Sequence, residues 1–278
     1  MADHIAGKSI VITGAGSGFG RLVAEGTAAR GAKVVCGDID IDSAEAVAKG
    51  IHAGGGDARA LHIDVTRLDQ VCALVQAAVD AHGAIDVMIN NAGTMPLAFI
   101  ADHEAAYAAW DRCIDINFKG VLNGIVAAFD PMIAQGRGHV INLSSIYGNH
   151  PVVGAAVYGA TKSAVNFLSE SLRVEGRGKI KVTVVKPTGV PVTGLSATVV
   201  NREAGVGILG QNMSAFTDMV MHMQAGTFPA ERLDCANVDY ASLAPQHIAD
   251  AIIHAIDQPW GVSIADITVR AAGDLFII

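Results

Sequence analysis

Thr13-Gly14-Ala15-Gly16-Ser17-Gly18-Phe19-Gly20 is a glycine-rich turn, and the expected architecture follows from it. An apolar run typical of a buried strand precedes it, and a helical pattern over residues 18–30 overlaps its end. Glycines let the backbone approach a pyrophosphate, and the N-terminus of the following helix offers free N–H groups to that anion. The alternative is a glycine-rich loop without a ligand, but the flanking strand and helix favour a dinucleotide site. The residues expected to contact the dinucleotide here are Gly14, Gly16, Ser17, Gly18, Phe19 and Gly20.

The rest of the chain alternates strand-like and helix-like patterns. Strands are expected at residues 9–13, 33–37, 58–63, 85–90, 139–144, 181–186 and 263–270. Helices are expected at residues 18–30, 43–53, 68–82, 103–135 and 157–176. Short strands joined by helical crossovers predict an α/β fold: one Rossmann-type, doubly wound domain over residues 1–278 with a seven-stranded parallel sheet. Residues of about 188–243 interrupt the alternation after the sixth strand, so we expect them to form a lid over the substrate.

Composition narrows the classes of protein. The 278 residues carry a formal net charge of −8 and no run of Lys or Arg, which argues against nucleic acid as a partner. No apolar run reaches the roughly 18 residues that cross a bilayer, so no membrane partner is expected. Four scattered cysteines without a C-x-x-C pair, and the absence of a signal-peptide pattern, predict a cytoplasmic protein. The ten histidines show no metal-ligand spacing, so we predict no metal site.

Acidic residues after the second and third strands bear on the kind of dinucleotide. Asp38 stands where a carboxylate accepts hydrogen bonds from an adenosine ribose diol and repels a 2′-phosphate, which favours NAD over NADP. Asp40 is the competitor for this role. Asp64, followed by Val65, is expected near the adenine amino group, although Asp64 or Thr66 could instead cap the next helix. The small residues expected against the adenosine side are Asn91, Ala92 and Gly93.

Tyr158 and Lys162 are the residues with the clearest chemistry. They are four positions apart, so they share one face of a helix, and Ser144 and Ser145 end the preceding strand. Hydride transfer to or from an alcohol requires a partner for the hydroxyl proton, and a free tyrosine has a pKa near 10, which is too high for an efficient base. An adjacent ammonium favours the phenolate, so we expect Lys162 to lower the pKa of Tyr158. A surface Tyr–Lys pair is the alternative, and the serine pair on the same sheet edge argues against it.

With these motifs in order, the chain resembles the short-chain dehydrogenase/reductase family over residues 8 to about 190. The resemblance implies that Tyr158 is the general acid/base, that Lys162 binds the nicotinamide ribose, and that Ser145 rather than Ser144 binds the substrate oxygen. It also implies that Asn117 helps to hold a water chain to Lys162; the alternative for Asn117 is a mid-helix kink satisfied by side-chain bonding. Family members usually have Pro-Gly after the sixth strand, whereas this chain has an apparent insertion. The cofactor contacts expected there are Pro187, Gly189, Val190 and Thr193. Thr188 is an alternative for the backbone contact to the carboxamide of the nicotinamide.

The expected substrate pocket is mostly apolar. Its residues are Met95, Ser145, Tyr147, His150, Val153, Leu195, Met213 and Phe216, with Leu97, Met219 and Met223 as further candidates. No arginine in this set offers a fork for a carboxylate, so we predict an NAD-dependent oxidoreductase that interconverts a small hydrophobic secondary alcohol, of the alicyclic, terpene or aryl kind, and its ketone.

Three alternatives stay open: a cis-dihydrodiol dehydrogenase, a hydroxy acid dehydrogenase, and a non-catalytic dinucleotide-binding protein. The resemblance also implies a homotetramer or homodimer formed through the helices at 103–135 and 157–176. Small residues expected to permit close packing there are Ala127, Ala128, Ala160 and Ala164.

Overall fold

The computed structural model describes residues 3–190 and 194–278. Seven strands form one parallel sheet in the order β3-β2-β1-β4-β5-β6-β7. The strands are β1 (Ser9–Thr13), β2 (Lys33–Asp38), β3 (Asp57–His62), β4 (Val87–Asn90), β5 (Gly138–Leu143), β6 (Ile180–Pro187) and β7 (Asp266–Val269). β1 and β4 are adjacent, so successive strands run outward in opposite directions from this pair, and the doubly wound α/β fold predicted from the sequence is confirmed.

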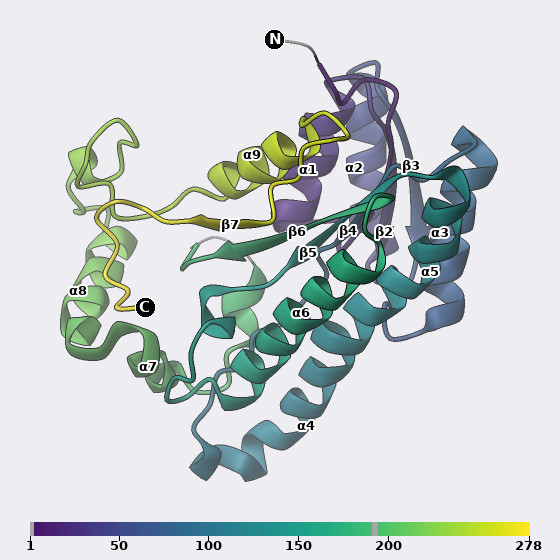
Figure 1. Ribbon diagram of the computed structural model, residues 1–278. Helices are drawn as coiled ribbons and strands as arrows, with labels where there is room; N and C mark the ends of the chain where they lie inside the picture. The colour runs from purple at the N-terminus through teal and green to yellow at the C-terminus, as the bar shows by residue number, and fades with distance from the viewer. Residues whose placement is uncertain (1–2, 191–193) are drawn as a thin grey trace.

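Helices cover both faces of the sheet (Figure 1). One face carries α1 (Gly18–Ala28), α2 (Ile41–Ala53) and α9 (Pro245–Ile256), and the other carries α3 (Leu68–His82), α4 (His103–Ile114), α5 (Gly120–Gln135) and α6 (Ala156–Glu175). The segment between β6 and α9 holds α7 (Val206–Leu209), α8 (Met213–Gln224) and short 3₁₀ turns, and it projects beyond the end of the sheet. None of the helices in the described ranges is both long and apolar enough to span a bilayer.

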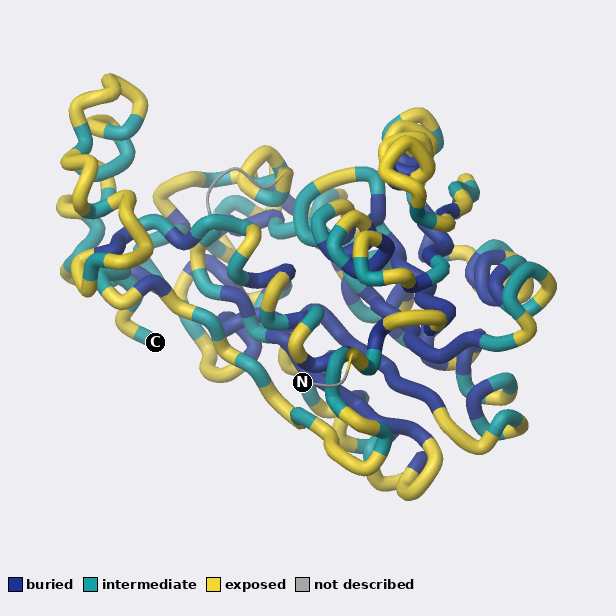
Figure 2. Tube along the Cα trace, turned by 90° about the horizontal axis from the view of Figure 1, so that it is seen from above, coloured by how far each residue is buried: buried dark blue, intermediate teal, exposed yellow. Residues whose placement is uncertain are grey.

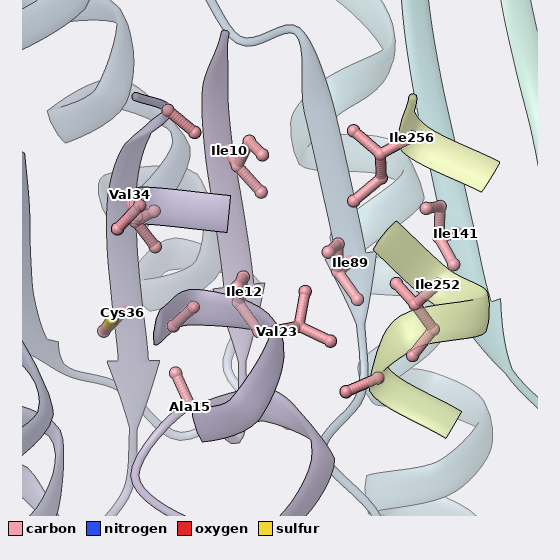
Figure 3. Close-up of a cluster of buried hydrophobic side chains, with 14 of the residues drawn as sticks. Ile10, Ile12, Ala15, Val23, Val34, Cys36, Ile89, Ile141, Ile252 and Ile256 are labelled. Carbon is pink, nitrogen blue, oxygen red and sulfur yellow. The ribbon is translucent and has the colours of Figure 1, made fainter. Parts of the chain in front are cut away.

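The sheet is buried on both faces because its strands are apolar on both sides. Figure 2 shows buried residues through the middle of the molecule and exposed residues around its rim. In one core, Ile10 and Ile12 of β1 pack with Ile89 of β4 and with Ile252 and Ile256 of α9 (Figure 3). All five residues are at most 1% exposed. Burying such side chains stabilises the fold by roughly 1.5–3 kcal/mol each, so the carboxyl ends of β1 and β4 are held firmly in place.

Several sequence expectations need correction. α9 was not expected, although its apolar residues recur at helical spacing and Pro245 stands at its first turn. β7 spans only Asp266–Val269 of the expected 263–270. The expected helix over 103–135 is interrupted by a π-helical turn, Asp115–Lys119, between α4 and α5. A π turn inserts one extra residue into the helix, and Asn117 lies within this turn.

Candidate active site

A large cavity lies beyond the carboxyl ends of the strands, where the order of the sheet reverses. Its volume is about 1180 Å³, and residues from the glycine turn, β2, β4, β5, α6 and the segment after β6 line it. Open α/β sheets bind ligands at this switch point. The cavity therefore brings most of the predicted cofactor residues together with Ser145, Tyr158 and Lys162.

The glycine turn is built for close approach of the backbone. A Cβ on Gly14, whose φ is +67°, would lie 2.9 Å from the Ala92 Cα, and one on Gly20 would overlap the carbonyl of Gly14. α1 begins at Gly18, with no side-chain cap from Ser17 and no acidic residue in its first turn. The first N–H groups of α1 and the positive end of its dipole are thus available to an anion, as a pyrophosphate requires.

The structure separates the roles of Asp38 and Asp40. Asp38 Oδ2 accepts a hydrogen bond from the Gly16 N–H at 2.8 Å, and Asp38 lines the cavity. Asp40 caps α2, accepting from the Ser43 N–H at 3.2 Å and from its hydroxyl at 2.6 Å. These hydrogen bonds lower the pKa of Asp40, first of all the one from the Ser43 side chain. Asp38, and not Asp40, is placed to meet a dinucleotide.

Asp64 also lines the cavity rather than capping a helix. Its Oδ1 accepts from the Thr66 N–H at 2.9 Å and from the Thr66 hydroxyl at 2.8 Å. α3 begins after Arg67, which makes no side-chain cap, so neither candidate for the cap is one. The neighbouring Val65 is 8% exposed, packs on Gly120 at the start of α5 and also lines the cavity.

Asn91 holds the end of β4 against the glycine turn. Its Nδ2 donates to the carbonyls of Thr13 at 3.0 Å and Gly14 at 2.9 Å. Asn91 and Ala92 both donate backbone N–H bonds to the Thr13 hydroxyl. The strip that the sequence placed against the adenosine side, including Gly93, thus forms one continuous wall with the glycine turn.

Asn117 fixes the residue that follows this strip. Its Nδ2 donates to the Thr94 carbonyl at 2.8 Å, and its Oδ1 accepts from the Thr94 N–H at 2.9 Å. Nδ2 also lies 3.3 Å from the Thr161 hydroxyl on α6. Asn117 is fully buried within the π turn, which interrupts the regular helix at this residue.

Tyr158 and Ser145 meet at the centre of the cavity. The two side chains are hydrogen bonded, and Tyr158 is 3% exposed. Ser144 instead donates its hydroxyl to the carbonyl of Lys162 at 3.1 Å, which points it away from the phenol. Tyr147 packs edge-to-face on Tyr158, with ring centroids 5.4 Å apart. This geometry favours Ser145 over Ser144, and the role of Ser145 toward the substrate stays a prediction.

Lys162 is buried beside the phenol. Its Nζ donates to the Leu143 carbonyl at 2.7 Å and lies 5.8 Å from the centroid of the Tyr158 ring. Burial lowers the pKa of Lys162 to about 8. Burial also raises the pKa of Tyr158 above its ordinary value, and the Ser145 hydrogen bond opposes this rise. The expected lowering of the Tyr158 pKa by Lys162 is therefore outweighed by desolvation in this structure.

The loop after β6 supplies the remaining cofactor candidates. Pro187, Gly189 and Val190 line the cavity, as does Thr188, whose hydroxyl donates to the Val269 carbonyl at 3.3 Å. Thr193 lies outside the described residues. The assignment of the backbone contact among Thr188, Gly189 and Val190 remains a prediction.

The substrate half of the cavity differs in part from the expectation. Met95, Ser145, Tyr147, Leu195 and Phe216 line it, and so do Leu97, Met219 and Met223.

Three expected members of this pocket are elsewhere. His150 is exposed because the 3₁₀ turn Ile146–Gly148 directs the chain outward, and Val153 is 64% exposed while its backbone packs on Gly207. Met213 packs at the start of α8 in the apolar cluster around Ile208.

Other lining residues were missed by the sequence analysis. Leu275 and Phe276 come from the segment after β7, Arg202 and Val199 from the segment after β6, and Ile39 follows Asp38. Only Ile39 could have been predicted from its neighbours in the sequence, because it is an apolar residue next to Asp38, the carboxylate expected to bind the dinucleotide. The others reach the cavity through contacts that are distant in sequence.

Comparison with known proteins identifies the family. The model of the short chain dehydrogenase family matches residues 8–204. An uncharacterized oxidoreductase of Listeria monocytogenes is 34% identical over 271 residues, which cover 95% of this chain and 96% of that protein. A 2,5-dichloro-2,5-cyclohexadiene-1,4-diol dehydrogenase of Sphingobium indicum is 37% identical over 198 residues, covering 69% of this chain and 78% of that protein.

Solved structures agree with this assignment. A 7α-hydroxysteroid dehydrogenase complexed with NADH and 7-oxo glycochenodeoxycholic acid has a TM-score of 0.76 and 25% identity, covering 97% of this chain and 94% of that one. A metagenomic short-chain oxidoreductase in complex with NADP has a TM-score of 0.72 and 28% identity, covering 96% and 98%. The chain belongs to the short-chain dehydrogenase/reductase family, and it is an oxidoreductase with a dinucleotide cofactor.

Proposed function

We propose that the protein is an NAD-dependent dehydrogenase and ketoreductase for a hydrophobic secondary alcohol. The observation that carries this proposal is the buried Tyr158–Ser145 pair, which lies beside the Lys162 ammonium in a cavity that has apolar side chains along the wall formed by α8 and residues 275–276. A bound nicotinamide dinucleotide supplies the hydride acceptor or donor at this site. The side chains of the protein must therefore accept or donate the proton of the substrate hydroxyl.

Tyr158 is the proton-exchanging group in this scheme. The phenol takes the proton of an alcohol, or returns one to a ketone, while the Ser145 hydroxyl orients the same oxygen. The Lys162 ammonium, 5.8 Å from the ring centroid, stabilises the phenolate against the cost of burial. Because the pKa of Lys162 is lowered only to about 8, this lysine is mostly charged at neutral pH.

The proposed preference for NAD rests on Asp38. Its Oδ2 is held by the Gly16 N–H at 2.8 Å, which directs the carboxylate across the glycine turn. A carboxylate in that position accepts hydrogen bonds from a ribose diol and repels a phosphate on the same ribose. We expect NAD to exceed NADP in kcat/KM by at least tenfold, about 1.4 kcal/mol.

The apolar walls support an alicyclic, terpene or aryl substrate. Phe216, Met219 and Met223 are spaced to share one face of α8, and all three line the cavity, as does Tyr147. Aromatic and thioether side chains contact rings well, and methionine adapts to irregular shapes.

The test is reduction of NAD by a panel of secondary alcohols of this kind. Wild type is compared with Tyr158→Phe, and NADH binding to both is measured by fluorescence. We expect Tyr158→Phe to bind NADH normally and to lose about 10²–10⁴-fold in kcat. Equal turnover by both proteins, or no turnover of any alcohol or ketone by wild type, would refute the proposal.

A cis-dihydrodiol is the second candidate substrate. The relative from Sphingobium indicum is named as a dehydrogenase of a cyclohexadiene diol, and it is 37% identical over 198 residues. Inclusion of cis-dihydrodiols in the same panel separates the two classes. A kcat/KM for a diol at least tenfold above that for every mono-alcohol would favour this candidate.

We also propose a homo-oligomer that uses the outer faces of α4, α5 and α6. Tyr107, Val126 and Phe167 are 69%, 49% and 78% exposed there. Of the small residues expected in this interface, Ala127 and Ala128 are excluded, because they are buried in the core of the same chain. Light scattering after gel filtration tests the proposal, and Phe167→Asp is expected to shift the assembly toward monomer.

A further inference from the structure

Residues 271–278, which follow β7, run from the sheet edge to α7 and α8 (Figure 1). Three hydrogen bonds to main-chain atoms of this segment fix its path. The Ile277 N–H donates to the Ile208 carbonyl at 2.9 Å, Asn212 Nδ2 donates to the Leu275 carbonyl at 2.9 Å, and Arg270 donates to the Phe276 carbonyl at 2.7 Å. The path is thus held without any contribution from the Phe276 side chain.

The Phe276 ring occupies the space where a side chain at position 189 would lie. A Cβ on Gly189 would overlap Phe276 Cζ and lie 2.6 Å from Cε2, closer than real Cβ atoms approach other side chains. The same ring pairs with Phe216 of α8, with centroids 6.1 Å apart, and it lines the cavity. One ring therefore touches both the loop after β6 and the helix that carries the apolar wall.

We propose that Phe276 is a specificity-determining residue, whose ring closes the pocket between the loop after β6 and α8 and limits the size of the substituent on the reacting carbon. Gly189 is a glycine because this ring fills its side-chain space. The sequence pattern had assigned Gly189 to the dinucleotide, so the two explanations make different predictions. The claim about substrate size rests on the proposed function, whereas the claim about Gly189 does not.

The physical basis is the volume of a phenyl ring in an apolar wall. Replacing the ring by a methyl group leaves space that a larger apolar substituent can fill, because the backbone on either side stays anchored. Contacts of this kind change discrimination between substrates by about 10–200-fold for each methylene-sized difference. A loss of the ring is expected to widen the range of accepted alcohols without changing Tyr158 or Ser145.

The first experiment measures kcat/KM for a series of alicyclic secondary alcohols of increasing ring size and substitution. Phe276→Ala, and Phe276→Leu as a milder variant, are compared with Phe228→Ala. Phe228 lies in the segment between β6 and α9 beneath the Arg232 guanidinium and does not line the cavity, so it is a matched control. We expect Phe276→Ala to raise the ratio of kcat/KM for the bulkiest to the smallest alcohol at least tenfold, Phe276→Leu to raise it less, and Phe228→Ala to leave it within twofold. An unchanged ratio in Phe276→Ala, or an equal shift in Phe228→Ala, overturns the proposal.

The second experiment needs no substrate, so it separates failure of this inference from failure of the proposed function. Thermal unfolding is followed without dinucleotide for wild type, Gly189→Ala, Phe276→Ala and the double variant. We expect Gly189→Ala to lower Tm by at least about 2–4 °C, and the double variant to unfold no lower than Phe276→Ala alone. If Gly189→Ala leaves Tm unchanged but weakens NADH binding equally with and without Phe276, the glycine serves the dinucleotide and the claim fails.

Discussion

Asn117 and Thr94 are joined by two hydrogen bonds of opposite sense, one from Asn117 Nδ2 to the Thr94 carbonyl and one from the Thr94 N–H to Asn117 Oδ1. This pairing replaces a strand partner for Thr94, which lies just beyond the end of β4. It also connects the π turn to the wall of the cavity, at a distance of 3.3 Å from the Thr161 hydroxyl of α6. The side chain therefore holds together three elements that surround the phenol.

Asn117→Ala leaves both backbone groups of Thr94 without these partners. We expect a loss of about 1–3 kcal/mol in the free energy of unfolding, because each buried polar group then lacks its hydrogen bond. Asn117→Asp should retain the bond from the Thr94 N–H but place a carboxylate against the carbonyl, with a similar loss. Urea unfolding and kcat measure the two effects, and a fully stable Asn117→Ala protein would contradict this role.

Ser144 and Ser145 are expected to respond differently to the same substitution. Ser145→Ala removes the hydroxyl that bonds Tyr158, so kcat should fall by about 10²-fold while NADH binding is unchanged. Ser144→Ala removes a buried bond to the Lys162 carbonyl and should cost about 1 kcal/mol of stability, with kcat within a few-fold of wild type. Steady-state kinetics and urea unfolding of both variants check this, and the reverse ranking in kcat would refute the assignment.

Asp38 and Asp40 provide a matched pair for the coenzyme preference. Asp38→Ala should reduce the ratio of kcat/KM for NAD to that for NADP by at least tenfold, because the repulsion of a 2′-phosphate is removed. Asp40→Ala should lower stability through the lost cap of α2 and leave the ratio unchanged. Kinetics with both coenzymes at matched concentrations are the measurement. A ratio that Asp40→Ala changes as much as Asp38→Ala would contradict the geometry.

His139 is expected to make the fold less stable in acid. Its Nε2 lies 2.8 Å from the hydroxyl of Thr183, which donates its own proton to the Ile264 carbonyl, so Nε2 carries the proton and the buried Nδ1 has no partner. Burial, followed by the charges of Lys181 and Lys8, lowers the pKa of His139 well below its ordinary value. Below about pH 6.5, His139 binds a proton in the unfolded chain but not in the folded protein. The stability present above that pH is therefore lost as the pH falls.

The slope from this single group approaches about 1.4 kcal/mol per pH unit below pH 6.5. His139→Gln keeps a donor toward Thr183 and cannot titrate, so it is the control. Urea unfolding at pH 7.5 and pH 5.5 should show a larger acid-dependent loss in wild type than in His139→Gln. Equal losses of unfolding free energy in both proteins would show that another group causes the loss of stability at low pH.

The features that the sequence predicted well are those encoded by short spacings. The alternation of apolar strands with helices gave the sheet, and the four-residue interval between Tyr158 and Lys162 placed both on α6 beside Ser145. α9 was missed because it follows the irregular segment directly, so no helix was expected between that segment and the last strand. The apolar residues of that helix nevertheless complete the core around Ile89.

The features that could not be predicted depend on contacts between distant segments. His150 is close in sequence to Ser145, but a 3₁₀ turn directs it to solvent. Phe276 is far from Gly189 in sequence, and only the path of the chain after β7 brings its ring to the cavity. The direction of the Tyr158 pKa could also not be predicted from the lysine one turn away, because burial of the phenol raises its pKa and the extent of burial depends on the walls that surround it.

The cavity walls divide along the sequence in a way that matters for protein engineering. The glycine turn, Asp38, Ser145 and Tyr158 come from the sheet layers and the loops between them, whereas a large part of the apolar wall comes from α8 and from residues 275–276. A mutant library confined to the inward-facing positions of α8 and to those two residues would diversify selectivity and leave the proton-transfer geometry untouched. New catalysts could therefore be sought in this scaffold by varying fewer than a dozen codons.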